Sequence, residues 1–229
     1  MGKQQKEKNR LPEEQAKLVR EFYPKNERQR ELVNLIEDNE VVIASGPAGT
    51  GKTYVTLATA LSLLGRTYKK IVLVKSVTTL PGEEIGFLKG GMEQKMEPFI
   101  MSYMWNIDKI CGPDVAQKLI DKKIIEVLPL AYIRGLSIDN SIVIIDEAQN
   151  IDAHTFKTMI TRIGEDSKYI FLGDTEQIDR RKKHESCLAN VLEIFKDSNL
   201  IGCIEFNDDD CVRNPIIPKI LAALRNSGI

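Results

Sequence analysis

A glycine-rich stretch in the first quarter of the chain has the spacing of a phosphate-binding loop. The sequence GPAGTGKT, residues 46–53, fits the pattern G-x-x-x-x-G-K-[ST]. Glycines in such a loop let the backbone turn so that its N–H groups point inward, toward a phosphate. The residues predicted to bind ATP here are Gly46, Pro47, Ala48, Gly49, Thr50, Gly51, Lys52 and Thr53. The Lys52 ammonium can reach the β- and γ-phosphates as a catalytic group, and the Thr53 hydroxyl can coordinate Mg²⁺.

Two neighbouring acidic residues end the apolar run of SIVIIDEAQN, residues 141–150. Asp146, at a strand end, can hold Mg²⁺ through water. Glu147 beside it can orient and deprotonate an attacking water as a catalytic base. A nucleotide kinase has no use for this second carboxylate, because its nucleophile is a substrate, so the pair favours hydrolysis. Alternatively, one of the two acids only caps a helix.

Two glutamines are further candidates. Gln177, in FLGDTEQID, is a predicted catalytic residue, because a neutral amide near the γ-phosphate can report its presence without adding charge. Gln29 can read an adenine edge with one donor and one acceptor. A plain polar turn and an exposed helical glutamine are the respective alternatives. ATP is preferred over GTP because the chain has no Asn/Thr-Lys-x-Asp element, and the absence of G-x-G-x-x-G excludes a dinucleotide fold.

Apolar strand patterns alternate with helical patterns along the chain, which predicts an α/β fold with a mostly parallel sheet covered on both faces. Ligands of such sheets bind at the carboxyl ends of the strands, where all these motifs fall. The segment 81–123 is mixed, with helices at its end. The strands are expected at 41–45, 70–76, 123–130, 141–149, 168–174 and 200–206, and helices at 26–40, 52–65, 152–163, 186–196 and 215–225.

The length of 229 residues suits one α/β domain, here placed at 21–229, and the net charge of −1 shows no global basic field. Residues 1–20 are predicted to be a charged, flexible tail, and nine Lys or Arg against five Glu over residues 1–30 leave a nucleic-acid-binding arm as the alternative. The four cysteines form no C-x-x-C pair, so free thiols are favoured over a zinc site. With no signal peptide and no membrane span expected, the predicted location is the cytoplasm.

Several segments together resemble one family, the PhoH-like ATPases. The resemblance covers roughly residues 26–225, and EIGFLKG and LAYIRG are more specific to it than the phosphate loop is. It rests on the segments GPAGTGKTYV, GEEIGFLKGGMEQKMEPF, IEVLPLAYIRG, IVIIDEAQN, TRIGEDSKYIFLGDTEQID and CVRNPIIPKIL. The family is similar to the first motor domain of superfamily 1 helicases. The resemblance therefore implies a three-layer P-loop NTPase (RecA-like) fold and a role on single-stranded RNA or DNA.

One stretch departs from the family pattern. VLVKSVTTLPGE has Lys75 and Ser76 where the family usually has an arginine and a proline. The corresponding helicase segment contacts the nucleic-acid strand, so the departure weakens that role for this stretch.

The resemblance also raises the question of an arginine finger. A helicase takes this arginine from a second motor domain, for which this chain has no room. The implied solution is a homo-oligomeric ring, of hexamer type, in which a neighbouring subunit supplies the arginine. Arg134, Arg162 and Arg213 match family motifs and are the candidates; for each, the alternative is an ordinary surface ion pair.

Three functions follow from these patterns. The leading interpretation is an ATPase, helicase-like, that couples ATP hydrolysis to remodelling RNA or DNA. The alternative is a nucleotide-gated assembly or switch protein with little turnover. A small-molecule kinase is the third, and the pair of Asp146 and Glu147 argues against it.

Overall fold

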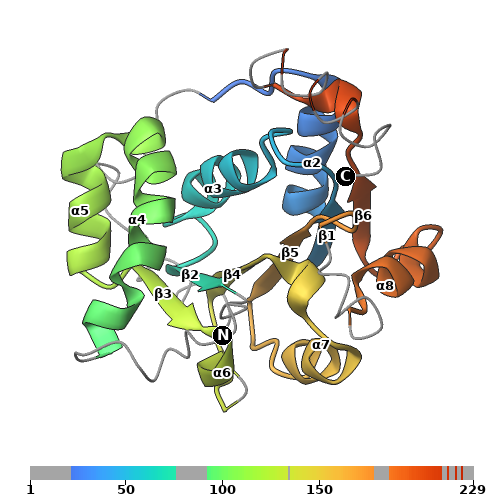
Figure 1. Cartoon of the computed structure of the whole chain (residues 1–229). Helices are drawn as coiled ribbons and strands as arrows, with labels where there is room; N and C mark the ends of the chain where they lie inside the picture. Colours follow the sequence, from blue (N-terminus) through green and yellow to red (C-terminus); the bar gives the residue numbers. More distant parts are fainter. Residues whose placement is uncertain are drawn as a thin grey trace, which may run out of the picture.

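The core of the molecule is a parallel sheet between two layers of helices. The computed structural model describes residues 22–75, 92–133, 135–177 and 186–212, and the single positions 216, 220 and 223. Six strands lie in the order β3-β2-β4-β5-β1-β6, and all five neighbouring pairs are parallel (Figure 1). The strands are β1 (Val41–Ser45), β2 (Lys70–Lys75), β3 (Ile125–Pro129), β4 (Ser141–Asp146), β5 (Lys168–Gly173) and β6 (Gly202–Glu205). The predicted three-layer α/β architecture is confirmed.

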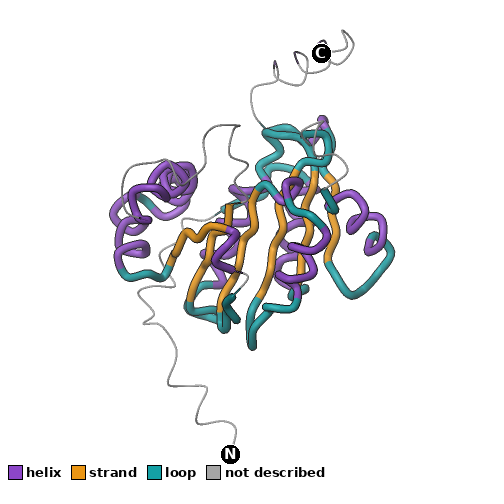
Figure 2. Tube along the Cα trace, turned by 60° about the horizontal axis from the view of Figure 1, so that its bottom comes forward, coloured by secondary structure: helices purple, strands orange, loops and turns teal. Residues whose placement is uncertain are grey.

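Helices cover both faces of this sheet, as Figure 2 shows from a second direction. The α-helices are α2 (Glu27–Asp38), α3 (Lys52–Leu63), α4 (Met92–Cys111), α5 (Pro113–Asp121), α6 (Leu130–Ile133), α7 (Ala153–Ile160) and α8 (Leu188–Phe195). Two 3₁₀ turns, η3 (Ala148–Asn150) and η4 (Asp208–Asp210), lie among the loops. The first four helices pack on one face, and α7 and α8 pack on the other.

The strands are buried on both faces, which explains their continuous runs of Val, Ile and Leu. On β1, Val42 and Ala44 belong to the cluster beneath α2 and α3, whereas Val41 and Ile43 belong to the cluster beneath α7 and α8. The same alternation runs through β2, β4 and β5, because successive side chains of a strand point to opposite faces. Two-sided burial makes the strand ends rigid supports for the loops that follow them.

Some boundaries differ from the predicted ones. The fourth strand was expected to run to residue 149, but β4 ends at Asp146. Glu147 adopts a left-handed conformation, with φ of 58°, and this turns the chain out of the sheet into η3. Likewise β3 ends at Pro129 and the chain turns at once into α6. In β4 the left-handed conformation of Glu147 thus ends the strand directly after its apolar run.

Several expectations fall outside the described residues. These include the tail at 1–20 and most of the expected helix at 215–225, of which positions 216, 220 and 223 are helical. Among the described residues, none of the helices combines the length and the hydropathy needed to cross a membrane.

Candidate active site

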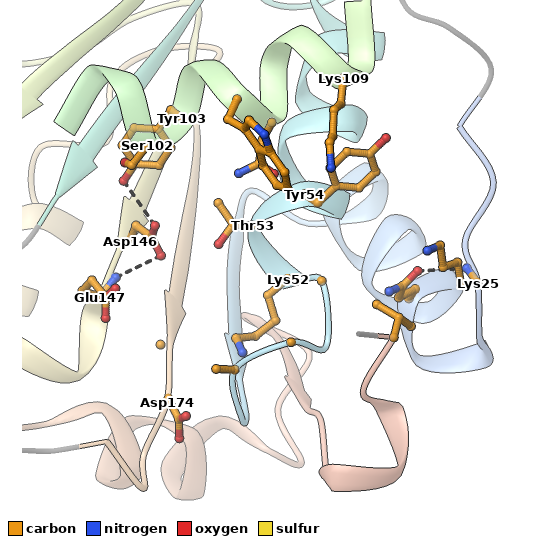
Figure 3. Close-up of a pocket in the computed structure, with 18 of the residues that line it drawn as sticks. Lys25, Lys52, Thr53, Tyr54, Ser102, Tyr103, Lys109, Asp146, Glu147 and Asp174 are labelled. Carbon is orange, nitrogen blue, oxygen red and sulfur yellow. Dashed lines mark hydrogen bonds between the residues drawn. The ribbon is translucent and has the colours of Figure 1, made fainter. Parts of the chain in front are cut away.

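The carboxyl ends of β1, β4 and β5 open into one cavity of about 720 Å³ (Figure 3). The Gly46 N–H, just after β1, donates to the carbonyl oxygen of Gly173 at the end of β5 over 3.2 Å. The predicted site residues that line this cavity are Gln29, Ala48, Gly49, Gly51, Lys52, Thr53, Asp146, Glu147 and Gln177. Residues from separate stretches of sequence therefore meet at one edge of the sheet, as the motif positions predicted.

Glycine is required at two positions of the loop. Gly46 has φ of 139°, and a Cβ there would collide with the carbonyl oxygen of Phe206, just after β6. Gly51 has φ of 86°, and a Cβ there would lie 2.7 Å from Nε2 of Gln29. Both positions combine a left-handed backbone with close neighbours, so a side chain would be strained and crowded. The loop is thus built against β6 on one side and α2 on the other.

Lys52 begins α3, and its side chain folds back inside the loop. Its Nζ donates to the carbonyl oxygens of Gly46, at 2.6 Å, and Pro47, at 2.9 Å. Thr50 is fully buried, and its hydroxyl also donates to the Pro47 carbonyl oxygen. Of the loop residues, Gly46, Pro47 and Thr50 thus shape the loop from within and hold the ammonium of Lys52, which also lines the cavity. A concave loop with an ammonium at its centre is chemically suited to an anion.

Asp146 lies opposite the loop, at the end of β4 (Figure 3). Its carboxylate accepts hydrogen bonds from the Tyr103 hydroxyl, at 3.3 Å, and from the Glu147 N–H, at 3.1 Å. Burial raises the pKa of Asp146, and the neighbouring charge of Glu147 raises it further, while Lys75 counteracts both. A buried carboxylate whose negative charge is under-compensated favours a bound cation. With the Thr53 hydroxyl in the same cavity, these oxygens fit a hard cation such as Mg²⁺.

A buried glutamine that sequence analysis did not single out holds Glu147 in place. Gln149 is 4% exposed, and its Nε2 donates to the Glu147 carboxylate over 2.7 Å. Its Oε1 accepts from the backbone N–H of Asp174, at 3.1 Å, after β5. Gln149 therefore joins the ends of β4 and β5 and orients Glu147. The signal that could have found it is a glutamine two residues after Glu147, in a segment that otherwise packs into the core.

The two predicted glutamines lie in different surroundings. Gln177 is exposed at the rim of the cavity, where its backbone N–H donates to the Asp174 carbonyl oxygen. Gln29 is 2% exposed, so it is not the exposed helical glutamine of the alternative interpretation. Its Nε2 donates to the Thr50 carbonyl oxygen, at 2.8 Å, and its Oε1 accepts from the Lys25 N–H, at 2.9 Å. Gln29 therefore supports the phosphate loop, with one N–H and one lone pair left for a base.

Sequence analysis also missed an aromatic side of the cavity. Tyr103 is buried on α4 against Asp146, and burial raises the pKa of its hydroxyl, which keeps it a hydrogen-bond donor. Tyr23, Tyr54 and Trp105 also line the cavity. Their spacing in sequence carries no motif, because they come from three separate elements.

Of the three arginine candidates, only Arg162 belongs to the described residues, and it does not line the cavity. Arg134 and Arg213 lie outside the described residues. Arg162 follows α7, and its carbonyl oxygen accepts from the Tyr169 hydroxyl near the start of β5. It therefore lies at the amino edge of the sheet, opposite the edge that carries the cavity.

Solved structures with little sequence identity share this fold. The large terminase of a thermophilic bacteriophage superposes with a TM-score of 0.50 and 12% identity, over 87% of this chain and 50% of the terminase chain. The UvsW helicase from bacteriophage T4 gives a TM-score of 0.50 and 12% identity, over 85% of this chain and 65% of the helicase chain. The predicted P-loop NTPase fold is confirmed.

Closer relatives share much more sequence. The chain is 38% identical to a PhoH-like protein of Bacillus subtilis (strain 168) over 195 residues, and 32% identical to Protein PhoH of Escherichia coli (strain K12) over 202 residues. These matches cover 85% and 87% of this chain but 61% and 57% of the relatives, so the chain spans about three fifths of their length. A family model described as PhoH-like protein matches residues 21–225. That match takes in the phosphate loop, the acidic pair and the whole of the sheet, and the chain belongs to the PhoH-like protein family.

Proposed function

We propose that the chain binds ATP with Mg²⁺, hydrolyses it, and couples hydrolysis to remodelling single-stranded RNA or DNA in the cytoplasm. One observation carries the proposal: Asp146 and Glu147 face Lys52 and Thr53 across a single cavity. The Lys52 ammonium in a glycine-rich loop suits the phosphates, and a second carboxylate beside the metal ligand suits activation of water.

Thr53 and Asp146 would hold the Mg²⁺. Both offer hard oxygen atoms to the same cavity, where burial above all, and then the neighbouring charge of Glu147, raise the pKa of Asp146. When bound, the ion supplies positive charge against the phosphate oxygens. Lys52 adds a second positive charge from the loop side, so negative charge that develops on the phosphates is met from two directions.

Glu147 is the proposed general base. Its left-handed backbone turns it out of the sheet, and Gln149 fixes its carboxylate through a 2.7 Å hydrogen bond. A carboxylate held in this way can accept a proton from a water molecule and orient the oxygen lone pair of that water toward the γ-phosphate. Gln177, at the rim and close in sequence to Asp174, is the proposed sensor of that phosphate.

A homo-oligomeric ring would complete the site. None of the described residues that line the cavity is an arginine, and stabilising the transferring phosphoryl group with an arginine raises rates by about 10³–10⁵ in P-loop enzymes. A neighbouring subunit in a ring, with a hexamer as the first assembly to test, would supply it from Arg134, Arg162 or Arg213. Arg162 at the far edge of the sheet is compatible with reaching a neighbour rather than its own cavity.

Phosphate release from ATP, measured with and without single-stranded RNA or DNA, tests the proposal. We expect Mg²⁺-dependent release that rises with nucleic acid, and turnover per subunit that rises with protein concentration across the assembly range. No release in any condition, from folded protein that binds ATP, would contradict it. If turnover per subunit stays constant across that range, the hypothesis of an arginine from a neighbouring subunit is wrong, while the rest of the proposal stands.

Because none of the described residues that line the cavity is an arginine, we also propose a second candidate, a nucleotide-gated switch with little turnover. In that case ATP binds tightly, phosphate is not released, and the assembly state changes with the nucleotide. Light scattering with ATP and with ADP, alongside the release assay, separates the switch from the motor.

A further inference from the structure

One helix presents an exposed stripe to the cavity. On α4, Ile107 and Ile110 are buried in the core and Tyr103 is buried against Asp146, whereas Trp105 and Lys109 are exposed and line the cavity together with Asn106. Trp105 is 62% exposed. An exposed aromatic side chain that lines a cavity with other aromatic and polar side chains is a candidate ligand-binding surface.

The residues beside this stripe share its chemistry. Tyr54 on α3, and Tyr23 and Lys25 before α2, line the same cavity; Tyr54 and Lys109 approach it from neighbouring helices in Figure 3. We name Tyr23, Lys25, Tyr54, Trp105, Asn106 and Lys109 the aromatic wall. The cavity's described carboxylates, Asp146, Glu147 and Asp174, all belong to the strand ends instead. The wall thus offers flat rings, two ammonium groups and an amide, without an acid of its own.

We propose that the aromatic wall binds the base and sugar of the nucleotide whose phosphates lie in the loop, with Trp105 as the stacking surface. This inference rests on the proposed function. Tyr54 directly follows Thr53, so the wall begins one residue beyond the phosphate loop and belongs to the same cavity. A nucleotide bound by its phosphates therefore has its base within this cavity, where flat rings are available.

The face of Trp105 already binds a cation. The Lys109 ammonium lies 3.3 Å from the centroid of the indole ring, close enough for a cation–π interaction. A purine can take one face of the ring while Lys109 remains on the other, and the Asn106 amide can hydrogen-bond a base edge. A base of single-stranded RNA or DNA has the same chemistry, but the continuity of the wall with the phosphate loop favours the bound nucleotide.

Trp105 is the single tryptophan of the chain, so its fluorescence reports directly on the wall. The full chain is titrated with MgATP, with magnesium tripolyphosphate, which has no base, and with a single-stranded oligonucleotide. We expect MgATP to quench Trp105 and tripolyphosphate to bind without comparable quenching. By calorimetry, Trp105→Leu should weaken MgATP binding by about 5- to 150-fold, the range of base–aromatic stacking, and leave tripolyphosphate affinity unchanged.

Two further variants control the result. Trp105→Phe keeps a ring and should retain most of the affinity. Tyr132→Leu removes an exposed aromatic side chain that does not line the cavity, and should bind MgATP as the wild type does. Circular dichroism checks that each variant is folded.

The outcomes separate this inference from the proposed function. Equal MgATP affinity in the wild type and Trp105→Leu overturns the inference while the proposed function stands. Quenching by the oligonucleotide, with unchanged MgATP affinity in that variant, overturns it in favour of a nucleic-acid site. If wild-type protein binds neither MgATP nor tripolyphosphate, the proposed function falls and the inference falls with it.

Discussion

The two ends of the cavity are built differently. At the phosphate end, Gly46, Asp146 and Asp174 each follow directly on, or end, a buried strand of the parallel sheet. On the aromatic wall, Tyr54 and Trp105 stand on helices, and Trp105 is largely exposed. Strand ends held by ladders on both sides cannot shift independently, whereas exposed helical side chains can change rotamer. The two proposals therefore assign chemistry to the rigid end and recognition of the base to the adjustable one.

Replacement of the proposed base should have the largest effect, and it should fall on chemistry alone. Glu147→Gln keeps the size of the side chain but removes the proton acceptor, so we expect turnover to fall by about 10²–10⁴-fold. MgATP affinity and quenching of Trp105 should stay within about twofold, because the wall and the loop are untouched. Phosphate release and calorimetry on the same protein measure the two effects.

A matched variant tests whether the loss of any carboxylate on the protein would lower turnover in the same way. Glu193→Gln removes an exposed acid on α8 that pairs with Lys196 at 2.6 Å. It should leave turnover unchanged. Near-normal turnover in Glu147→Gln would remove Glu147 from the base role and end the contrast between the two ends.

The second prediction concerns the rigidity of the phosphate end. Gly46→Ala places a methyl group against the Phe206 carbonyl oxygen at a left-handed backbone position. We expect a loss of about 1–3 kcal/mol in the free energy of unfolding, together with weaker tripolyphosphate binding. Denaturant unfolding and calorimetry measure the two effects.

Gly135→Ala is the control for that substitution, since a Cβ there has no neighbour within 4 Å. Its free energy of unfolding should change by no more than about 0.5 kcal/mol. Equal stability of the two variants would show that the loop yields easily, which contradicts a rigid phosphate end.

The smallest expected effect on turnover comes from the link between β4 and β5. Gln149→Leu leaves the Glu147 carboxylate without its donor and the buried Asp174 N–H without its acceptor. We expect kcat to fall by about one order of magnitude with KM unchanged, because a displaced catalytic group loses rate rather than binding. Steady-state phosphate release over a range of ATP concentrations measures both constants.

Gln117→Leu serves as the matched change at a surface site, because Gln117 bonds Asp121 on the exposed side of α5. It should leave both constants unaltered. If Gln149→Leu raised KM and left kcat unchanged, Gln149 would act in nucleotide binding and not in positioning Glu147. The proposed division between the two ends of the cavity would then be wrong.

Much of the fold could be predicted from the sequence. Continuous Val, Ile and Leu runs such as SIVIID indicated strands buried on both faces, and helical patterns between them indicated parallel connections. The end of β4 was placed three residues too late, because Glu147 takes a left-handed conformation that its residue type does not announce. Apolar pattern predicts where a strand lies, whereas a single backbone dihedral decides where it stops.

The residues of the site also fall into two groups, those that the sequence could predict and those that it could not. Lys52, Thr53, Asp146 and Glu147 could be found because their chemistry needs fixed spacing next to a strand end. Gln149 was missed because its role depends on a contact with the end of β5. Trp105 was missed because nothing in its local sequence distinguishes it from an aromatic residue of the core. Gln29 lines the cavity and its role toward adenine stays a prediction; its bond to the Thr50 carbonyl oxygen was not foreseen.

The sequence by itself determined the α/β class, the phosphate loop and the acidic pair, because these depend on residues that are neighbours along the chain. Only the tertiary structure decided which groups meet at this edge of the sheet: the Tyr103 hydroxyl with the Asp146 carboxylate, the Gln149 amide with the Asp174 backbone N–H, and Trp105 in the same cavity as Tyr54. The physical reason is that parallel strands bring residues from distant stretches to one edge, and packing of α4 against α3 sets which rings reach it.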